Sequence, residues 1–284
     1  MFINNISKFL PNYKDYKKSE FKKILSWANK GFDAYKIEKD FLLTLILIKF
    51  GEKYPDLIFK GGTCLNKIYF PYFRLSEDLD FVIDLDISRA KRQTLLKKYE
   101  NNFVEDLGLL GLNLKLERTK FDEHKMAIFT FEYDSVINNS TQHIKIDISL
   151  KNNLELPVFP GKIQSIFIDK ILEKPIFGDH YINCIDLKES IAEKMRASLT
   201  RITPAIRDFF DIWYVKNNSD FDFQDREFKK LLDIKLQEVG YAYTLQDSFD
   251  LLEKQIKTDL KPVLNEDFAF DFPSIYDFIM SFKV

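Results

Sequence analysis

The strongest constraint on the fold is a strict alternation of side chains over residues 78–87. Apolar residues fill every second position, and aspartates fill all of the positions between them except that of Val82. Because successive side chains of a β-strand point to opposite faces, this period of two predicts a strand with one buried face. Residues 143–150 alternate in the same way, with isoleucine or leucine at every second position. The chain therefore needs a sheet with one covered face.

The segments around these two strands predict an α/β chain of the α+β kind, a mixed sheet with flanking helices. Further strand-like apolar runs lie at residues 57–59, 112–118 and 126–133. Helical spacing of apolar residues predicts helices in the first 50 residues or so. We also expect one helix from Thr63 until Pro71 stops it, and another from an N-cap at Ser88 to Gly108.

The sequence pattern changes after Leu150. Prolines and a glycine predict an irregular connection at Pro157, Pro160 and Gly161. Helical patterns follow, so we place a domain boundary near residue 170. The expected organisation is a sheet domain with a helical N-terminal extension over residues 1–170 and a helical domain over residues 171–284.

Two helix starts can be predicted in the second domain. Asp186 and Glu189 have the spacing of a capping box, which predicts a helix from there to about Ile202. Thr203 and Pro204 supply an N-cap and a proline at the first helical position for the next helix.

Composition excludes several classes of protein. The chain has 42 Lys and Arg against 44 Asp and Glu, a formal net charge of −2, so its surface as a whole is not a polycation for nucleic acid. The longest apolar run, residues 41–48, is too short for the ~20 residues of a membrane span. The N-terminus lacks the pattern of a signal peptide. Two cysteines cannot form a disulfide framework or a zinc site, so we expect reduced thiols and a cytoplasmic protein.

Paired carboxylates on the alternating strand are the first candidate site. Asp78 and Asp80 project from one strand face, about 6.5–7 Å apart along the chain. Such a pair can share one or two hard divalent cations such as Mg²⁺, which prefers oxygen ligands. Asp147 lies on the polar face of residues 143–150 and completes an acidic cluster if the two strands are neighbours. The alternative is a solvated strand face, and this is how we interpret Asp84 and Asp86.

A glycine turn precedes this strand. Gly61 and Gly62 allow positive φ and close approach of a ligand to the backbone. A helix that begins just after them, at Thr63, would direct free N–H groups towards a phosphate. A Gly-Gly-Thr sequence is also common in simple turns, so the ligand hypothesis depends on the nearby carboxylates.

Together these residues carry a resemblance. Residues 60–67, KGGTCLNK, and residues 74–81, RLSEDLDF, resemble the first motif of the AbiEii/AbiGii family of nucleotidyltransferases, the toxins of type IV toxin–antitoxin systems, to which the MenT toxins are related. Lys145-Ile146-Asp147 resembles the second motif. The pair Glu189 and Lys194 resembles the third, and the segment from Asp208 to Asp211 resembles the fourth.

The resemblance implies a polymerase-β-like domain that transfers a nucleoside monophosphate from an NTP and releases pyrophosphate. It assigns Mg²⁺ to Asp78, Asp80 and Asp147, and nucleotide contacts to Gly61, Gly62, Thr63, Arg74 and Ser76. Lys194 and Asp211 match family positions implicated in activity. The implied acceptor is an RNA such as a tRNA 3′ end, and the implied partner is an antitoxin protein.

Helical geometry leaves alternatives open for the third and fourth motifs. Glu189 and Lys194 lie about 140° apart around a helix, so they do not pair on one face. Glu189 is either the far half of the capping box or a functional residue, and Lys194 is either solvated or directed at phosphate. Asp211 either forms a surface ion pair with Arg207 or orients Lys194 or Arg201.

Two other functions remain open. Enzymes with this type of site also transfer nucleotides to proteins or small molecules, and a nucleotide-binding module without turnover would keep some of the same features. The near-neutral charge is compatible with a local basic cleft around an acidic floor, for which the candidates are Lys60, Lys67, Arg74, Lys194, Arg201 and Arg207.

Overall fold

The computed structural model describes residues 25–26, 28, 31–116, 120–122, 125–150, 154–169, 173–264 and 268–282. The helices expected before residue 25 lie outside the described residues. The chain divides into two compact units. Unit 1 comprises Met1–Leu154 and Val158–Cys184, and unit 2 comprises Glu155–Pro157 and Ile185–Val284. The division falls after Cys184 rather than near residue 170.

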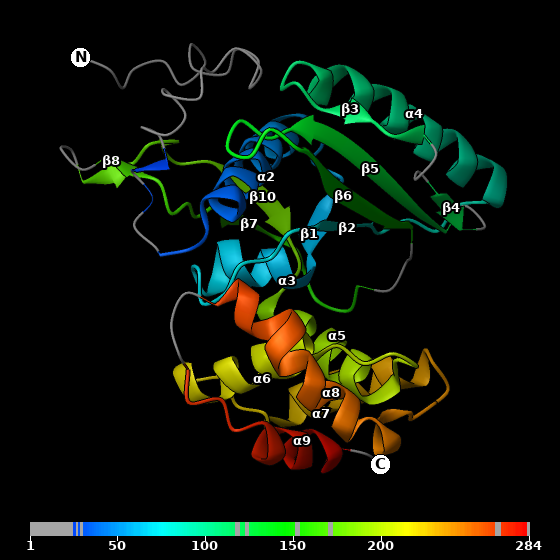
Figure 1. The fold of residues 1–284 in the computed structure, drawn as a ribbon. Helices are drawn as coiled ribbons and strands as arrows, with labels where there is room; N and C mark the ends of the chain where they lie inside the picture. The colour runs from blue at the N-terminus through cyan, green and yellow to red at the C-terminus, as the bar shows by residue number, and fades with distance from the viewer. Residues whose placement is uncertain are drawn as a thin grey trace. The chain divides into compact units, whose positions relative to one another are not determined.

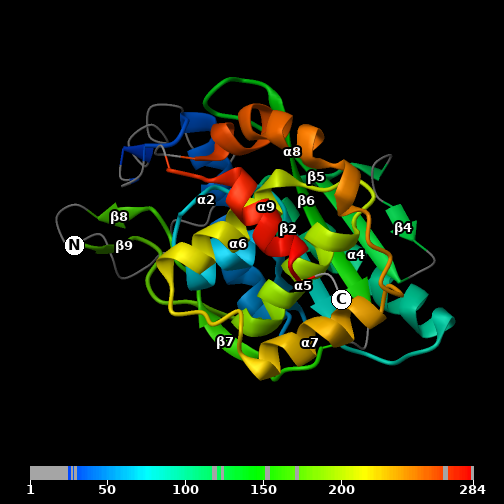
Figure 2. The same cartoon turned by 90° about the horizontal axis from the view of Figure 1, so that it is seen from below.

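Unit 1 contains a mixed sheet with the strand order β3-β5-β6-β2-β1-β10-β7, and β4 pairs with β5 beside that path. The strands are β1 (Ile58–Lys60), β2 (Leu79–Ile83), β3 (Asn113–Leu114), β4 (Lys120–Asp122), β5 (Met126–Asp134), β6 (Thr141–Leu150), β7 (Phe159–Lys162) and β10 (Tyr181–Cys184). The pairs β2–β6 and β1–β10 are parallel, and the other pairs are antiparallel. A separate hairpin, β8 (Ile168–Asp169) and β9 (Lys174–Pro175), projects from the unit (Figure 2).

Helices α2 (Ala34–Lys53) and α4 (Arg89–Gly108) cover one face of the sheet (Figure 1). Phe50 of α2 stacks on Phe103 of α4 with ring centroids 4.5 Å apart. The same two rings contact Phe81 of β2 and Phe129 of β5. This aromatic core accounts for the apolar half of the alternating strands, because burial of such large rings supplies much of the free energy of packing.

The second alternating strand ends where predicted but begins two residues earlier, and the first is shorter than predicted. β6 covers residues 143–150, whereas β2 ends at Ile83 instead of continuing to residue 87. Asp86 is exposed as predicted, but Asp84 is half-buried, and its Oδ1 is inaccessible to solvent. The alternation thus predicted the strand but not its end, because the pattern does not show where the strand loses its hydrogen-bonded neighbour in the sheet.

The connection predicted at Pro157, Pro160 and Gly161 contains strand β7, and strand β10 lies where the helical domain was expected, so both predictions are wrong. β7 includes Pro160 and Gly161, and β10 pairs with both β1 and β7. Proline is tolerated in a strand at the edge of a sheet, because the N–H that it lacks would face solvent and not a neighbouring strand. β7 is such an edge strand. β10 joins the sheet between β1 and β7, which is why unit 1 extends to Cys184.

Helix predictions in unit 1 are close to the structure. α4 begins after an N-cap at Ser88 and ends at Gly108, as expected. The helix predicted from Thr63 begins two residues earlier: α3 (Gly61–Cys64) continues directly into the π-helical turn η3 (Leu65–Tyr69). π-helical turns are rare and occur frequently at functional sites.

Unit 2 is helical in its described residues. It contains α5 (Leu187–Thr200), α6 (Ile206–Asn218), α7 (Arg226–Gln237), α8 (Phe249–Gln255) and α9 (Phe272–Met280), with short turns η5 (Leu245–Asp247), η6 (Ile256–Leu260) and η7 (Lys261–Val263) (Figure 2). Asp186 caps α5 by accepting a hydrogen bond from Lys188 N. The second predicted start is wrong by two residues, since Ala205 is the N-cap of α6. Across the described helices of the chain, none has the length and apolar character of a membrane span.

Candidate active site

Asp80 and Asp147 are direct neighbours in the sheet. β2 and β6 pair in parallel with Asp80 opposite Asp147, so both side chains project from the same face. Asp78 immediately precedes β2 and has the same parity as Asp80. This face is opposite to the one that packs on α2 and α4, because Phe129 and Ile128 of β5 pair with Ile146 and Asp147 respectively. The structure therefore places the three predicted carboxylates on the same face of the sheet, and their sharing of one site stays a prediction.

The carboxylate of Asp80 lies against the backbone of Gly61. A Cβ atom at Gly61 would be 2.2 Å from Oδ2 of Asp80, which no real contact allows. The φ angle of Gly61 is +76°, a left-handed conformation that side chains other than glycine adopt only with strain. Both observations require glycine, and they join the glycine turn to the carboxylates in one site.

Gly62 carries a second close approach. A Cβ there would lie 2.7 Å from a guanidinium nitrogen of Arg74 and 3.2 Å from Oγ of Ser76. Arg74 is buried, and its guanidinium also donates to the carbonyl of Leu75 at 2.9 Å. The two polar residues matched to nucleotide contacts therefore lie directly over the glycine turn.

Thr63 links the glycine turn to the carboxylate strand. Its hydroxyl donates a hydrogen bond to the backbone carbonyl of Asp78, and its side chain is fully buried. The side chain thus holds α3 against the start of β2. A nucleotide contact from Thr63 is consequently left to its backbone N–H.

The environment of Asp147 disfavours its negative charge. Burial, together with the charges of Asp80 and Asp78, raises the pKa of Asp147 to about 7, and nearby Lys145 only partly offsets this rise. Among the described residues, Oδ1 of Asp147 is buried and has no hydrogen-bond partner. A buried polar atom without a partner is costly, so this oxygen is a natural point of contact for a cation or a substrate.

The chemistry of these donors fits a hard divalent cation. Three carboxylates converge with an unpartnered oxygen among them, and Mg²⁺ binds carboxylate oxygens while keeping other positions for water or phosphate. In the described part of the chain, no three His, Cys, Asp or Glu side chains stand in a complete metal-binding arrangement. These carboxylates are therefore candidate ligands, and metal binding stays a prediction.

Two of the basic residues expected around the cleft occupy different environments. Lys60 pairs in register with Asp80, so its side chain projects from the face that carries the carboxylates. Lys67 is fully buried and forms an ion pair with Asp40 at 2.7 Å. The expectation that Lys67 flanks the cleft is therefore wrong. Its side chain, about one helical turn beyond the glycines, faces the interior of unit 1.

In unit 2, Lys194 and Asp211 are in contact. Nζ of Lys194 lies 2.7 Å from Asp211 and 2.8 Å from Asp208, and Asp211 is fully buried. The interpretations of Lys194 as a solvated lysine and of Asp211 as half of a surface ion pair with Arg207 are both wrong. Arg201 contacts Asp208 at 2.8 Å. The prediction that Asp211 orients Lys194 is confirmed as a contact, and its role in activity stays a prediction.

Glu189 is not the partner in a capping box. Its carboxylate accepts hydrogen bonds from the backbone N–H groups of Glu155 and Leu156, each at 2.9 Å. It also forms an ion pair at 2.6 Å with Lys235, and both side chains are fully buried. Glu189 therefore fastens the segment Glu155–Pro157 to the helices of unit 2, a role for which the sequence contains no local signal.

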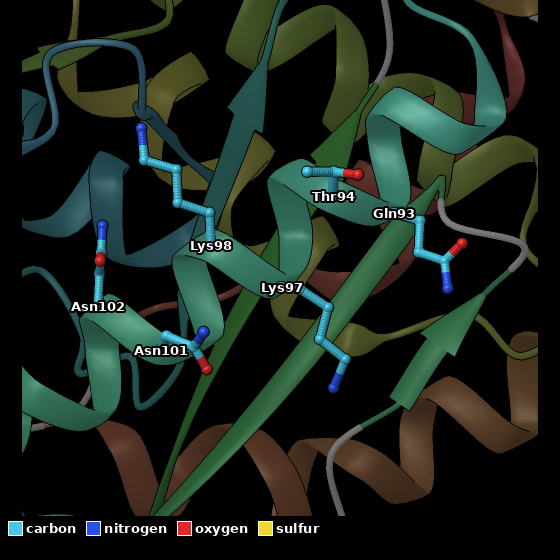
Figure 3. Close-up of a pocket in the computed structure, with 6 residues that line it drawn as sticks. All are labelled: Gln93, Thr94, Lys97, Lys98, Asn101 and Asn102. Atoms are coloured by element: carbon cyan, nitrogen blue, oxygen red, sulfur yellow. The ribbon is translucent and has the colours of Figure 1, made fainter.

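A shallow pocket of about 520 Å³ lies elsewhere in unit 1, along α4 (Figure 3). Its lining consists of side chains from that helix alone: Gln93, Thr94, Lys97, Lys98, Asn101 and Asn102. Because α4 covers the sheet face opposite to Asp80 and Asp147, this pocket is not part of the carboxylate site.

Comparison with known proteins places the chain among the nucleotidyltransferases. The family model described as "Nucleotidyl transferase AbiEii toxin, Type IV TA system" matches residues 46–280. The chain therefore belongs to the AbiEii nucleotidyltransferase toxin family of type IV toxin–antitoxin systems, as the sequence motifs predicted. The family implies an NTP substrate.

Other comparisons are more distant. No curated protein matches the chain. A solved structure of JHP933 from Helicobacter pylori is 17% identical, with a TM-score of 0.49 over 89% of this chain and 91% of that one. A putative nucleotidyltransferase from H. pylori is also 17% identical, with a TM-score of 0.47 over 87% of this chain and 92% of that one.

Proposed function

We propose that the protein is a Mg²⁺-dependent nucleotidyltransferase toxin with a polymerase-β-like site, which transfers a nucleoside monophosphate from an NTP to an RNA acceptor such as a tRNA 3′ end. The observation that carries this proposal is the convergence of Asp80, Asp147 and the Gly61 backbone on one face of the sheet. Membership of the family supports the reaction type.

Different residues of unit 1 would bind Mg²⁺ and the phosphates of the NTP. Asp78, Asp80 and Asp147 would hold Mg²⁺, which when bound neutralises triphosphate charge and activates the attacking hydroxyl. Gly61 and Gly62 leave the backbone open to the phosphates. Arg74 and Ser76, which lie over Gly62, supply a cation and a hydroxyl for the same phosphates.

The reaction balances without any further reagent. The acceptor hydroxyl oxygen forms a bond to the α-phosphorus, and the bond from that phosphorus to the bridging oxygen of the β-phosphate breaks. Pyrophosphate leaves, and the hydroxyl proton is released. We assign Oδ1 of Asp147, which lacks a partner among the described residues, as the atom that accepts this proton and passes it on to water.

Lys194 and Asp211 are proposed as activity residues because they match family positions. Within unit 2, the carboxylates of Asp208 and Asp211 hold the Lys194 ammonium in one position. Family position alone supports a role in activity, because the Lys194 ammonium is already paired with two carboxylates inside unit 2. Replacement of Lys194 by Met is expected to lower transfer with little change in the Km for NTP.

The acceptor is tested by incubating the protein with each labelled NTP, Mg²⁺ and either total RNA or an RNA-free protein extract. We expect label in RNA and release of pyrophosphate. Label in protein instead of RNA would show that the acceptor is a protein. Calorimetric binding of NTP without pyrophosphate release in any extract would contradict an enzyme and favour a binding module.

The toxin role and its antitoxin are tested in cells. Expression of the protein is expected to stop growth, and co-expression of a protein encoded beside it is expected to restore growth. Unimpaired growth at expression levels that give measurable transfer in lysates would contradict the toxin role while leaving the enzyme assignment standing.

A further inference from the structure

Four polar side chains form a closed cluster in the interior of unit 1. Asp40 and Thr44 belong to α2, Lys67 belongs to η3, and Tyr72 lies in the segment that leads to β2. All four are at most 3% exposed. The reaction described above uses none of them, although burial of two charges is costly unless their geometry is good.

Hydrogen bonds and one ion pair join the four side chains of the cluster. The Lys67 ammonium contacts Oδ1 of Asp40 at 2.7 Å, Oγ1 of Thr44 at 2.9 Å and the Tyr72 hydroxyl at 2.8 Å. The Tyr72 hydroxyl in turn donates to Oδ2 of Asp40 at 2.9 Å, and Thr44 donates to the carbonyl of Asp40. Lys67 therefore makes two hydrogen bonds and one ion pair within the cluster.

Burial and the charge of Asp40 act in opposite directions on the pKa of Lys67 and in the same direction on that of Tyr72. Burial lowers the pKa of Lys67, and the Asp40 carboxylate partly restores it. Burial raises the pKa of Tyr72, and the charge of Asp40 raises it as well. Buried ion pairs contribute little net stability compared with apolar packing, but they hold their elements in a defined geometry.

Tyr72 joins the cluster to the glycine turn. Its φ angle is +59°, a left-handed conformation that is rare for a bulky residue and persists only where the surroundings enforce it. Its backbone N–H donates to the carbonyl of Asn66 in η3 at 3.2 Å. Two residues further on, Arg74 lies over Gly62, and Ser76 follows.

We propose that the cluster of Asp40, Thr44, Lys67 and Tyr72 is a positioning device for the nucleotide site. By fixing Tyr72 between α2 and η3, it holds Arg74 and Ser76 over the Gly61–Gly62 backbone. Tyr72 and Lys67 are thus positioning residues rather than catalytic ones. The proposal of a role in nucleotide affinity rests on the proposed function, whereas the geometric part of the proposal does not.

Replacement of Tyr72 by Phe removes the hydroxyl that joins Lys67 and Asp40 and keeps the ring. We expect kcat/Km for NTP to fall about 10- to 100-fold, mainly through Km, as misplacement of binding groups by a fraction of an ångström does. The matched control is Tyr54→Phe. Tyr54 also donates a buried hydrogen bond, to Asp106, but it connects α2 to α4.

A readout without nucleotide separates this proposal from the proposed function. Hydrogen exchange over residues 73–76 is expected to speed up in Tyr72→Phe and to stay unchanged in Tyr54→Phe. Unchanged exchange, or equal Km values in the two variants, would overturn the positioning role. If hydrogen exchange is faster in Tyr72→Phe but the unmodified protein transfers no nucleotide, the proposed function is overturned and the positioning role stands.

Charge is tested by the double variant Asp40→Asn/Lys67→Met, which leaves no unpaired charge in the interior. We expect it to fold, with a Km for NTP raised at least as much as in Tyr72→Phe. A double variant with the Km of the unmodified protein would show that the ion pair serves only the stability of unit 1.

Discussion

In unit 2, the buried carboxylates of Glu189 and Asp211 each lie within 2.7 Å of a lysine ammonium, whereas in unit 1 Asp147 lies beside Asp80 and Asp78. The charges of unit 2 are compensated within the fold. Oδ1 of Asp147, by contrast, has no hydrogen-bond partner among the described residues, and burial together with the charges of Asp80 and Asp78 raises the pKa of Asp147.

This difference teaches where to look for a ligand. A compensated buried charge has no need of a ligand, and its removal exposes the partner to an apolar interior. Like charges held together are a cost that a bound cation can relieve, which is why perturbed carboxylates are frequent at functional sites. The comparison predicts opposite responses to mutation, ordered here by their expected effect on the free energy of unfolding.

The largest effect is expected for Lys235→Met in unit 2. This change leaves Glu189 charged and buried, which costs about 3–5 kcal/mol of stability for a broken buried pair. Urea unfolding of the purified variant measures the loss. The double variant Glu189→Gln/Lys235→Met is the control and should recover much of it. A loss below about 1 kcal/mol in the single variant would contradict the claim that the pair is tightly compensated.

Gly61→Ala is expected to have the next largest effect. The left-handed φ costs roughly 1–2 kcal/mol, and the new Cβ would displace the Asp80 carboxylate, so transfer activity should also fall. Gly108→Ala is the matched control, because no atom lies within 4 Å of a Cβ at that position. Equal activity of the two variants would refute the close approach of Asp80 to the glycine turn.

Asp147→Asn is expected to stabilise the protein at neutral pH while abolishing most activity. Because the pKa of Asp147 is raised from 3.8 to about 7, the folded state binds the extra proton between these values, and the stability of the unmodified protein falls as pH rises through that window. The gain in the variant at pH 8 should be on the order of 1 kcal/mol, since partial exposure screens the charges.

The check is urea unfolding of both proteins at pH 4 and at pH 8. The difference should be close to zero at pH 4 and should favour the variant at pH 8. A difference that is independent of pH, or one that favours the unmodified protein at pH 8, would show that Asp147 is compensated after all.

The smallest effect is expected for Asp86→Asn. Asp86 follows β2 and is exposed, so the change should alter stability by no more than about 0.5 kcal/mol and leave transfer unchanged. A large loss of activity in this variant would extend the acidic site beyond the three carboxylates.

The sequence allowed prediction of the parts that depend on local patterns. The alternation around Asp80 and Asp147 identified both strands, and the parity of these residues identified the acidic face. The N-caps Ser88 and Asp186 located two helix starts. The family match added the glycine turn, Arg74 and Ser76 to the same site.

The parts that depend on distant partners were not predictable. Pro160 and Gly161 indicated a loop because the pattern does not reveal that β7 is a sheet edge. Lys67 was predicted to be a basic residue of the cleft because its partner, Asp40, lies on another helix and is not apparent from the local sequence. Glu189 read as a capping residue because Lys235 and the backbone of Glu155 reach it only in the folded unit.

The most direct test of the central claim, that the unit 1 carboxylates are completed by Mg²⁺ and NTP, is calorimetric titration with non-hydrolysable analogues of the four NTPs, with and without Mg²⁺. At least one analogue should bind the unmodified protein and Asp86→Asn tightly only when Mg²⁺ is present, and Asp80→Asn should lose this Mg²⁺-dependent part. Equal affinity of Asp80→Asn and the unmodified protein in Mg²⁺ would contradict the account.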